Sequence, residues 1–336
     1  MNRRTFLSVA AASSVVSAST AQMARAQPAG RFAEAIAYSA QRDGAAFLVA
    51  RHGIILREEY HGGHADLRYP IGVGTRMFAP LLAASLVEDR LLSLDEMVAL
   101  TLGDWGAHPV KSTISIRSLL SGASGITFGR SRDRTLDAAL ALDPVDPPGV
   151  SFHADEAPYV LFAEIARRKL QGSGGESDPA RWLTTRTLLP VGCVPIGWAR
   201  GADGAARIDD GAAVSARGWA LAGELLRRDG VWRAQQLIDE NVVREAMRGS
   251  FAEARAGFGV WLAAPGRTRD DPDFDSDLWR GRSPAPPTLA MAAGRAGQRL
   301  YISPTEGLVI ARLSRDSEGA RQWSDAQFLS LVYRDL

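Results

Sequence analysis

The chain has 336 residues, of which 46% are hydrophobic and 23% are charged, which is ample material for one sizeable globular core. Its 39 basic and 38 acidic residues give a formal net charge of +1, a balance that does not favour nucleic-acid binding. Cys193 is the single cysteine, so no internal disulfide can form, and no Cys/His spacing typical of zinc is present. We therefore expect neither a metal site nor a cofactor.

Residues 1–26 have the features of an export signal. Arg3 and Arg4 precede Thr-Phe-Leu in the pattern of a twin-arginine signal, and a mildly apolar Ala/Ser/Val run follows. Ala24-Arg25-Ala26 fits a small-x-small cleavage site. The alternative interpretation of residues 1–26 is an ordinary N-terminal helix. We predict cleavage after Ala26 and a location in the periplasm or outside the cell, with a mature net charge near −2 because three arginines and no acids are lost. No later run is long and apolar enough to span a bilayer.

The chain after the leader begins with a helix and a strand pair. A helix is expected at 32–41, and strands at 46–50 and 54–60 are joined by the short turn Arg51-His52-Gly53. His61 and His64 follow in a polar loop, but a metal pair there would need a third ligand, which the sequence does not supply.

The segment 69–95 combines a glycine-containing turn with an apolar helix. Apolar residues recur there at helical spacing, namely Phe78, Leu81, Leu82, Leu86 and Val87. The helix is expected to run from Arg76 to about Arg90 and to enter the core.

The remaining pattern is helical first and returns to strands near the end. Helices are expected from near 113, at 156–170, 179–189, 216–228, 239–248 and 325–333, and strands at 258–262, 301–303 and 307–311. The stretch 265–287, rich in Asp, Arg and Pro, is expected to be an exposed and mobile loop.

Several short motifs occur in a fixed order along this pattern. They are Pro70-Ile71-Gly72 before the apolar helix, Leu119-Leu120 with Ser124-Gly125, Pro148-Gly149 with Tyr159-x-Leu161, Phe258-Gly259 with Trp261, and Gly294. Together they resemble the serine β-lactamase, D,D-peptidase and esterase superfamily, in the branch of class C β-lactamases and 6-aminohexanoate-dimer hydrolases, over residues 30–334.

The resemblance implies an α/β (α+β) β-lactamase-like fold. An antiparallel sheet built from both chain ends, 27–72 and 255–336, would be flanked by helices, and a mainly helical subdomain, 73–254, would be inserted between them. The whole of 27–336 would then be one β-lactamase-like domain.

The same resemblance places Val73 at the serine position and Arg76 at the lysine position of the Ser-x-x-Lys motif. Valine has no nucleophilic atom, and a guanidinium stays protonated, so it cannot act as a general base. Only Lys111 and Lys169 are lysines, and neither has a serine three residues earlier. No Ser-x-x-Lys therefore exists elsewhere in the chain.

Two further motifs of the family are also altered. The Tyr-x-Asn positions read Ala154 and Glu156, with Tyr159 one helical turn further on, and the Lys-Thr-Gly positions begin at Ala292 and end at Gly294. The resemblance gives six candidates for the binding cleft: Arg76, Asp155, Glu156, Tyr159, Ala292 and Gly294.

The altered positions suggest an ion pair inside the former active site. We expect Arg76 to pair with Glu156, with Asp155 as a second possible partner, because an arginine and a carboxylate suit bidentate pairing. The alternative is that both charged groups point to water.

The function implied is that of an inactive family member, a pseudoenzyme whose cleft binds a small molecule or a peptidoglycan-like peptide. One alternative is a hydrolase of esters, amides or β-lactams with rebuilt residues, in which Thr75, the only hydroxyl within the degenerate motif, is the nucleophile. Another is a scaffold that binds an envelope protein through its helical face.

Overall fold

The computed structural model describes residues 24–25, 30–194, 196–264, 276–280, 284–315 and 322–336. Most of the proposed leader and the greater part of the loop at 265–287 lie outside these ranges. No helix in the described ranges is long and apolar enough to cross a bilayer.

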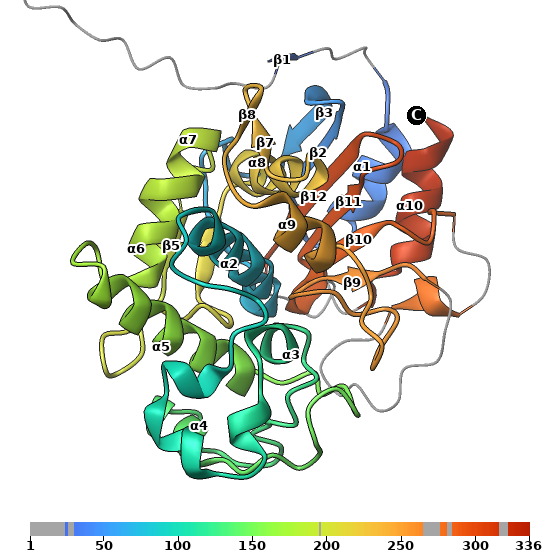
Figure 1. Ribbon diagram of the computed structural model, residues 1–336. Coiled ribbons are helices and arrows are strands. Elements are labelled where there is room, and N and C mark those ends of the chain that lie inside the picture. Colours follow the sequence, from blue (N-terminus) through green and yellow to red (C-terminus); the bar gives the residue numbers. More distant parts are fainter. Residues whose placement is uncertain (1–23, 26–29, 195, 265–275, 281–283, 316–321) are drawn as a thin grey trace, which may run out of the picture.

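A seven-stranded sheet forms one side of the molecule (Figure 1). Every neighbouring pair is antiparallel except the short first strand, which pairs in parallel with β3. In spatial order the strands are β1 (Ala24–Arg25), β3 (Ile54–Tyr60), β2 (Gly44–Arg51), β12 (Leu308–Ser314), β11 (Arg299–Ser303), β10 (Ala290–Ala293) and β9 (Trp261–Leu262). The sheet is thus built from both ends of the chain, as predicted.

Side chains alternate between the two faces of this sheet because successive residues of a strand point in opposite directions. In β2, Leu48 joins the core beneath α8 (Ala216–Arg227), whereas Phe47 and Val49 join a second cluster with α1 (Ala33–Ala40) and α10 (Asp325–Arg334). Helices therefore cover both faces of the sheet (Figure 1). Helix α8, which comes from the segment 73–254, thus packs directly on the sheet.

The rest of the inserted segment is mainly helical. Its helices are α2 (Phe78–Glu88), α3 (Ile116–Leu120), α4 (Leu136–Ala141), α5 (Ala157–Gly172), α6 (Pro179–Leu183), α7 (Leu189–Val191) and α9 (Glu240–Ala246). Two small sheets were not predicted: β4 (Tyr69–Pro70), β6 (Ala212–Val214) and β5 (Ile196–Trp198) form one, and β7 (Val231–Trp232) and β8 (Gln235–Gln236) the other. Their strands are too short to show a clear two-residue alternation.

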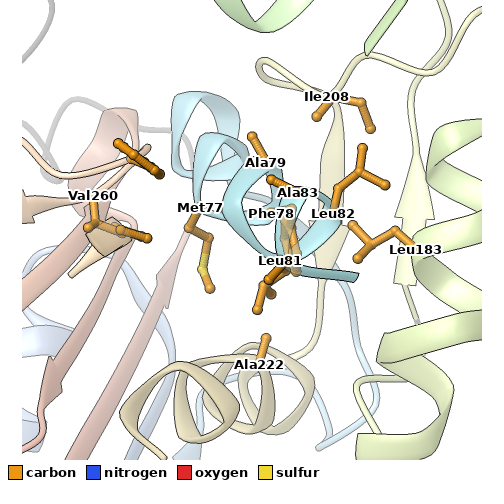
Figure 2. Packing of buried hydrophobic residues seen from close by; sticks show 14 of the residues in the cluster. Met77, Phe78, Ala79, Leu81, Leu82, Ala83, Leu183, Ile208, Ala222 and Val260 are labelled. Carbon is orange, nitrogen blue, oxygen red and sulfur yellow. The ribbon is translucent and has the colours of Figure 1, made fainter. Parts of the chain in front are cut away.

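Helix α2 is the centre of the larger core. Its residues from Phe78 to Leu86 are all buried, and Figure 2 shows Leu81 directed towards Ala222 of α8 and Leu82 towards Leu183 of α6. Pro80 is tolerated because it lies in the first turn, where backbone N–H groups have no helical acceptor. The helix begins two residues later than predicted because Gly72–Met77 forms a 3₁₀ helix ahead of it.

One part of the predicted exposed loop is instead buried. Ser276, Leu278 and Trp279 are buried, and the Trp279 indole donates a 2.9 Å hydrogen bond to the Leu262 carbonyl oxygen. The prediction of an exposed loop was wrong here, because Leu278 and Trp279, two large apolar residues within a polar stretch, are buried beside β9.

Two glycines hold the 3₁₀ segment close to the sheet. A Cβ on Gly294 would lie 2.0 Å from the Ile71 carbonyl oxygen, and one on Gly259 would lie 2.2 Å from the Arg76 carbonyl oxygen. Gly259 also has a φ of +68°, which favours glycine. The backbone around residues 71–76 can approach the end of β10 only because these side chains are missing.

We expect Gly294→Ala to lower the free energy of unfolding by roughly 1–3 kcal/mol, because the added methyl group collides with backbone that cannot move aside. Gly103→Ala is the matched control, since nothing lies within 4 Å of a Cβ there. Urea unfolding of both variants measures the difference. Equal effects of the two substitutions would contradict this account of the packing.

Candidate functional site

A cavity of about 40 Å³ lies where the 3₁₀ segment, the loop before α5 and the end of the sheet meet. This volume holds about three water-sized spheres. Its lining residues come from five segments of the chain: Val73 and Arg76; Gly122; Phe152, His153, Ala154, Asp155 and Tyr159; Ala256, Gly257, Gly259, Val260 and Trp261; and Ala293.

The structure brings together five of the residues selected from the sequence. Val73, Arg76, Ala154, Asp155 and Tyr159 all line the cavity, although they come from segments some eighty positions apart. The fold therefore brings these five positions to one cavity.

Four other selected residues do not line the cavity: Thr75, Glu156, Ala292 and Gly294. Ala292 is buried in the main core, and its neighbour Ala293 faces the cavity instead. The Gly294 N–H donates to the Gln298 carbonyl oxygen, so this glycine acts in the turn after β10.

Thr75 is committed to holding the backbone. Its hydroxyl donates a 2.6 Å hydrogen bond to the Gly72 carbonyl oxygen and accepts a 3.0 Å bond from the Ala212 N–H. The side chain is fully buried. The hydroxyl thus joins the 3₁₀ segment to β6 and has no access to the cavity.

Arg76 is partly buried and lies against an aromatic ring. Its guanidinium carbon is 5.2 Å from the centre of the Tyr159 ring, a cation–π arrangement. Its Nε atom is buried without a hydrogen-bond partner, and the described residues include no ion pair for this side chain.

The predicted ion pair between Arg76 and Glu156 is wrong. Glu156 pairs with Arg134 instead, with 3.0 Å between Oε1 and Nη1. The reason is that the loop before α4 brings a second arginine to this carboxylate, and nothing in the motif pattern indicates that approach.

Asp155, the second possible partner of Arg76, is occupied by other donors. Its carboxylate accepts hydrogen bonds from the Thr127 hydroxyl and from the N–H groups of Phe128, Gly129 and Ala157, at 2.8 to 3.3 Å. One of these bonds satisfies a free N–H at the start of α5. Asp155 therefore organises the wall of the cavity.

Burial dominates the titration of the groups beside Arg76. It raises the pKa of Glu156 above its ordinary value of 4.5, against the opposing charges of Arg134 and Arg76. It also raises the pKa of Tyr159, again against the Arg76 charge. Burial and the neighbouring Asp209 raise the pKa of Asp210, while Arg207, Arg76 and Arg295 oppose them.

Nine of the lining residues were not selected as site residues from the sequence, among them Phe152, His153 and Trp261. His153 has its Nε2 atom 3.1 Å from Asp146 Oδ2, and Phe152 packs edge to face on Trp261 with ring centres 5.7 Å apart. Two signals were available: Phe152 and His153 directly precede the altered Tyr-x-Asn positions, and Trp261 belongs to the motif that begins at Phe258. No group of three or more His, Cys, Asp or Glu side chains suited to a metal ion occurs in the part of the chain that the structure describes.

The two-ended antiparallel sheet, the inserted helices and the cavity at their junction define the serine-hydrolase fold of the β-lactamase type. Residues 21–331 match the family profile named Beta-lactamase, and the chain belongs to this family. Comparison with curated protein sequences gives no significant match.

Solved structures with the same fold have diverse activities in their names. EstCE1, described as a hydrolase with promiscuous acyltransferase activity, is 15% identical with a TM-score of 0.70, covering 90% of this chain and 98% of its own. A penicillin-binding protein homolog from Caulobacter crescentus is 18% identical with a TM-score of 0.67, covering 91% and 98%. A family VIII carboxylesterase is 15% identical with a TM-score of 0.67, covering 91% and 96%. At these identities the likeness shows the fold alone.

The pKa of Glu156 predicts how its removal changes stability with pH. Because the folded state raises this pKa, the native protein binds the proton more tightly than the unfolded chain, and stability falls as pH rises above about 4.5. Glu156→Gln removes this loss, so the variant should gain stability relative to the wild type between pH 4 and pH 7. Urea unfolding at several pH values measures the gain.

Glu164→Gln is a control of opposite sign. Burial opposes ionisation of Glu164, but hydrogen bonds from Arg167 and Arg168 lower its pKa, so its carboxylate stabilises the protein above its ordinary pKa. This variant should lose stability relative to the wild type over the same rise in pH. Parallel pH profiles for the two variants would contradict the assignment of Glu156.

Proposed function

We propose that this protein is an exported member of the β-lactamase family that does not catalyse acyl transfer and that binds a ligand, or an envelope partner, at the former catalytic cavity. One observation carries the proposal: the described residues that line the cavity include no Ser, Thr, Cys or Lys. Acyl transfer in this fold needs a nucleophile and a proton acceptor beside it. In a serine hydrolase, loss of the nucleophile alone lowers kcat by about a millionfold.

The size of the cavity supports the same conclusion. At about 40 Å³ it is far below the roughly 300–1,000 Å³ of sites that enclose drug-sized ligands. Phe152 and Trp261 occupy part of the space between the loop before α5 and the end of the sheet.

A hydrolase with rebuilt residues is the second candidate, and one observation favours it. His153 lines the cavity and contacts Asp146, and a histidine oriented by a carboxylate is a common general base. Such an enzyme would have to activate water, since Thr75, the other proposed nucleophile, is buried and bonded on both sides.

The scaffold hypothesis predicts that a partner binds at the helical face and not at the cavity. If the helical face binds an envelope protein, changes to surface loops would abolish binding and changes around Arg76 would not. If the cavity is the binding site, the opposite pattern is expected.

Covalent labelling tests the proposed absence of acyl transfer. The purified exported protein is incubated with a fluorophosphonate and, separately, with a penicillin, and its intact mass is measured beside that of an active serine hydrolase of this fold. We expect no added mass. An adduct on Thr75 or on a serine near the cavity would overturn the proposal, and the same spectrum tests cleavage after Ala26.

A second labelling experiment uses a variant in which the family residues are restored. The variant Val73→Ser, Arg76→Lys, Ala154→Tyr and Glu156→Asn should acquire label, because the frame that positions these residues is retained. Folding of the variant is checked by circular dichroism.

Thr75 variants separate its structural role from a catalytic one. Thr75→Val should lower the free energy of unfolding by about 1–3 kcal/mol, because the buried Ala212 N–H loses its acceptor, whereas Thr75→Ser should keep both bonds. Neither should change hydrolysis of p-nitrophenyl acetate. If the Val variant loses hydrolysis that the Ser variant keeps, Thr75 is a nucleophile; if only His153→Asn loses it, the water-activating candidate is supported.

A further inference from the structure

We infer that the cavity is a binding site for a carboxylate group and that Arg76 is the residue that holds it. The inference deepens the proposed function and rests on it, since a site that transfers acyl groups would use this space differently. The argument begins with the one guanidinium of the cavity wall, which lies at the cavity without a protein partner among the described residues.

The carboxylates nearest to Arg76 are already satisfied. Asp155 accepts four hydrogen bonds, and Glu156 pairs with Arg134. Asp210, which senses the charge of Arg76, pairs with Arg207 at 2.9 Å. Arg76 is therefore left with its donors free although acidic groups surround it.

A free guanidinium in this position favours an anionic ligand. An arginine has five N–H donors in a rigid planar fork. The Nε of Arg76 is closed off from solvent, so a ligand in the cavity would meet the two terminal Nη groups. A ligand carboxylate can accept two parallel hydrogen bonds from such a fork. The Tyr159 ring beside the guanidinium limits its movement, so less freedom is lost when the ligand binds.

The volume of the cavity limits the size of the chemical group that can bind beside Arg76. A space of about three water-sized spheres matches a carboxylate, which has three heavy atoms. Beside it, the Phe152 and Trp261 rings offer an apolar surface for a short substituent. The ligand is accordingly a small carboxylic acid or the carboxylate end of a longer molecule.

The surrounding charge does not oppose an anion. The groups that influence Glu156 and Asp210 include four arginines and two further carboxylates: Arg76, Arg134, Arg207, Arg295, Asp155 and Asp209. Glu156 and Asp210 are each paired with one of these arginines, Arg134 and Arg207. A bound carboxylate therefore meets acidic groups whose charges are already paired.

Acetate is the probe for this site, with acetamide and chloride as matched controls. At constant ionic strength, sodium acetate should raise the melting temperature in a saturable way, because a ligand that binds only the folded state stabilises it. Acetamide has nearly the same shape without the charge, so it should not raise the melting temperature. Sodium chloride at the same ionic strength should not raise it either. Equal effects of acetate and either control would overturn the inference.

Variants then locate the site. Arg76→Met should weaken acetate binding by at least roughly tenfold to a hundredfold, because the loss of even one of the two hydrogen bonds to a charged group has an effect of this size. Arg76→Lys should weaken it less because the charge remains. Arg248→Met is the control, since Arg248 is exposed and lines a separate groove of about 640 Å³ between α3 and α9. Wild-type affinity in Arg76→Met, or a loss in Arg248→Met alone, would refute the assignment.

The source of the carboxylate is settled by a peptide pair. Glycyl-alanine and its C-terminal amide differ only in the group that Arg76 would hold. Tighter binding of the peptide than of acetate, with none of the amide, would identify a peptide terminus as the ligand, whereas tighter binding of acetate would identify a small free acid. Equal binding of peptide and amide would contradict the inference.

This result and that of covalent labelling can be separated. If the protein forms no adduct and acetate does not stabilise it, the proposed function stands and only the carboxylate site is refuted. A covalent adduct would overturn the proposed function whatever acetate does. If the Arg76 variants do not fold, nitrogen-15 NMR of the wild type is used: one arginine Nε–Hε signal should shift saturably with acetate and not with acetamide, and no shift would refute the inference.

Discussion

The close approach of the 3₁₀ segment to the backbone at Gly259 and Gly294 positions one wall of the cavity. The Ile71 carbonyl oxygen lies 2.0 Å from the position that a Cβ of residue 294 would take, and the Arg76 carbonyl oxygen lies 2.2 Å from that of residue 259. These contacts fix the 3₁₀ segment against the end of the sheet, and α2 then has to enter the core at Phe78. Because the interior is packed at high density, a shift of this segment would disturb α2 and its neighbours together.

The opposite wall of the cavity is equally constrained, but by a charge. Asp155 binds three backbone N–H groups and the Thr127 hydroxyl, and so it joins the loop at 127–129 to the start of α5. This carboxylate cannot turn towards Arg76 without leaving several donors unsatisfied, which is costly in a partly buried place. The walls therefore hold Arg76 in position while their own polar groups are committed to one another.

The sequence could predict the parts of this fold that depend on periodicity or on local motifs. The spacing of apolar residues predicted α2, α5 and α8, and the motif frame brought Val73, Ala154 and Tyr159 to one cavity. It could not predict that Arg134 would take Glu156, because that pairing depends on where an irregular loop lies in three dimensions. The burial of Trp279 was missed for the same reason, since its partner β9 lies beyond a polar stretch.

The interactions that preserve the frame do not involve the atoms that would react. Thr75 uses its hydroxyl to join Gly72 to Ala212, and Met77 accepts a hydrogen bond from the Trp219 indole, so the segment is anchored on both sides of Arg76 by buried contacts. Neither contact requires a serine at position 73 or a lysine at position 76. A chain of this fold can therefore lose the chemistry of acyl transfer at little cost in stability. The cavity beside these contacts is lined by Arg76, whose Nε has no hydrogen-bond partner among the described residues.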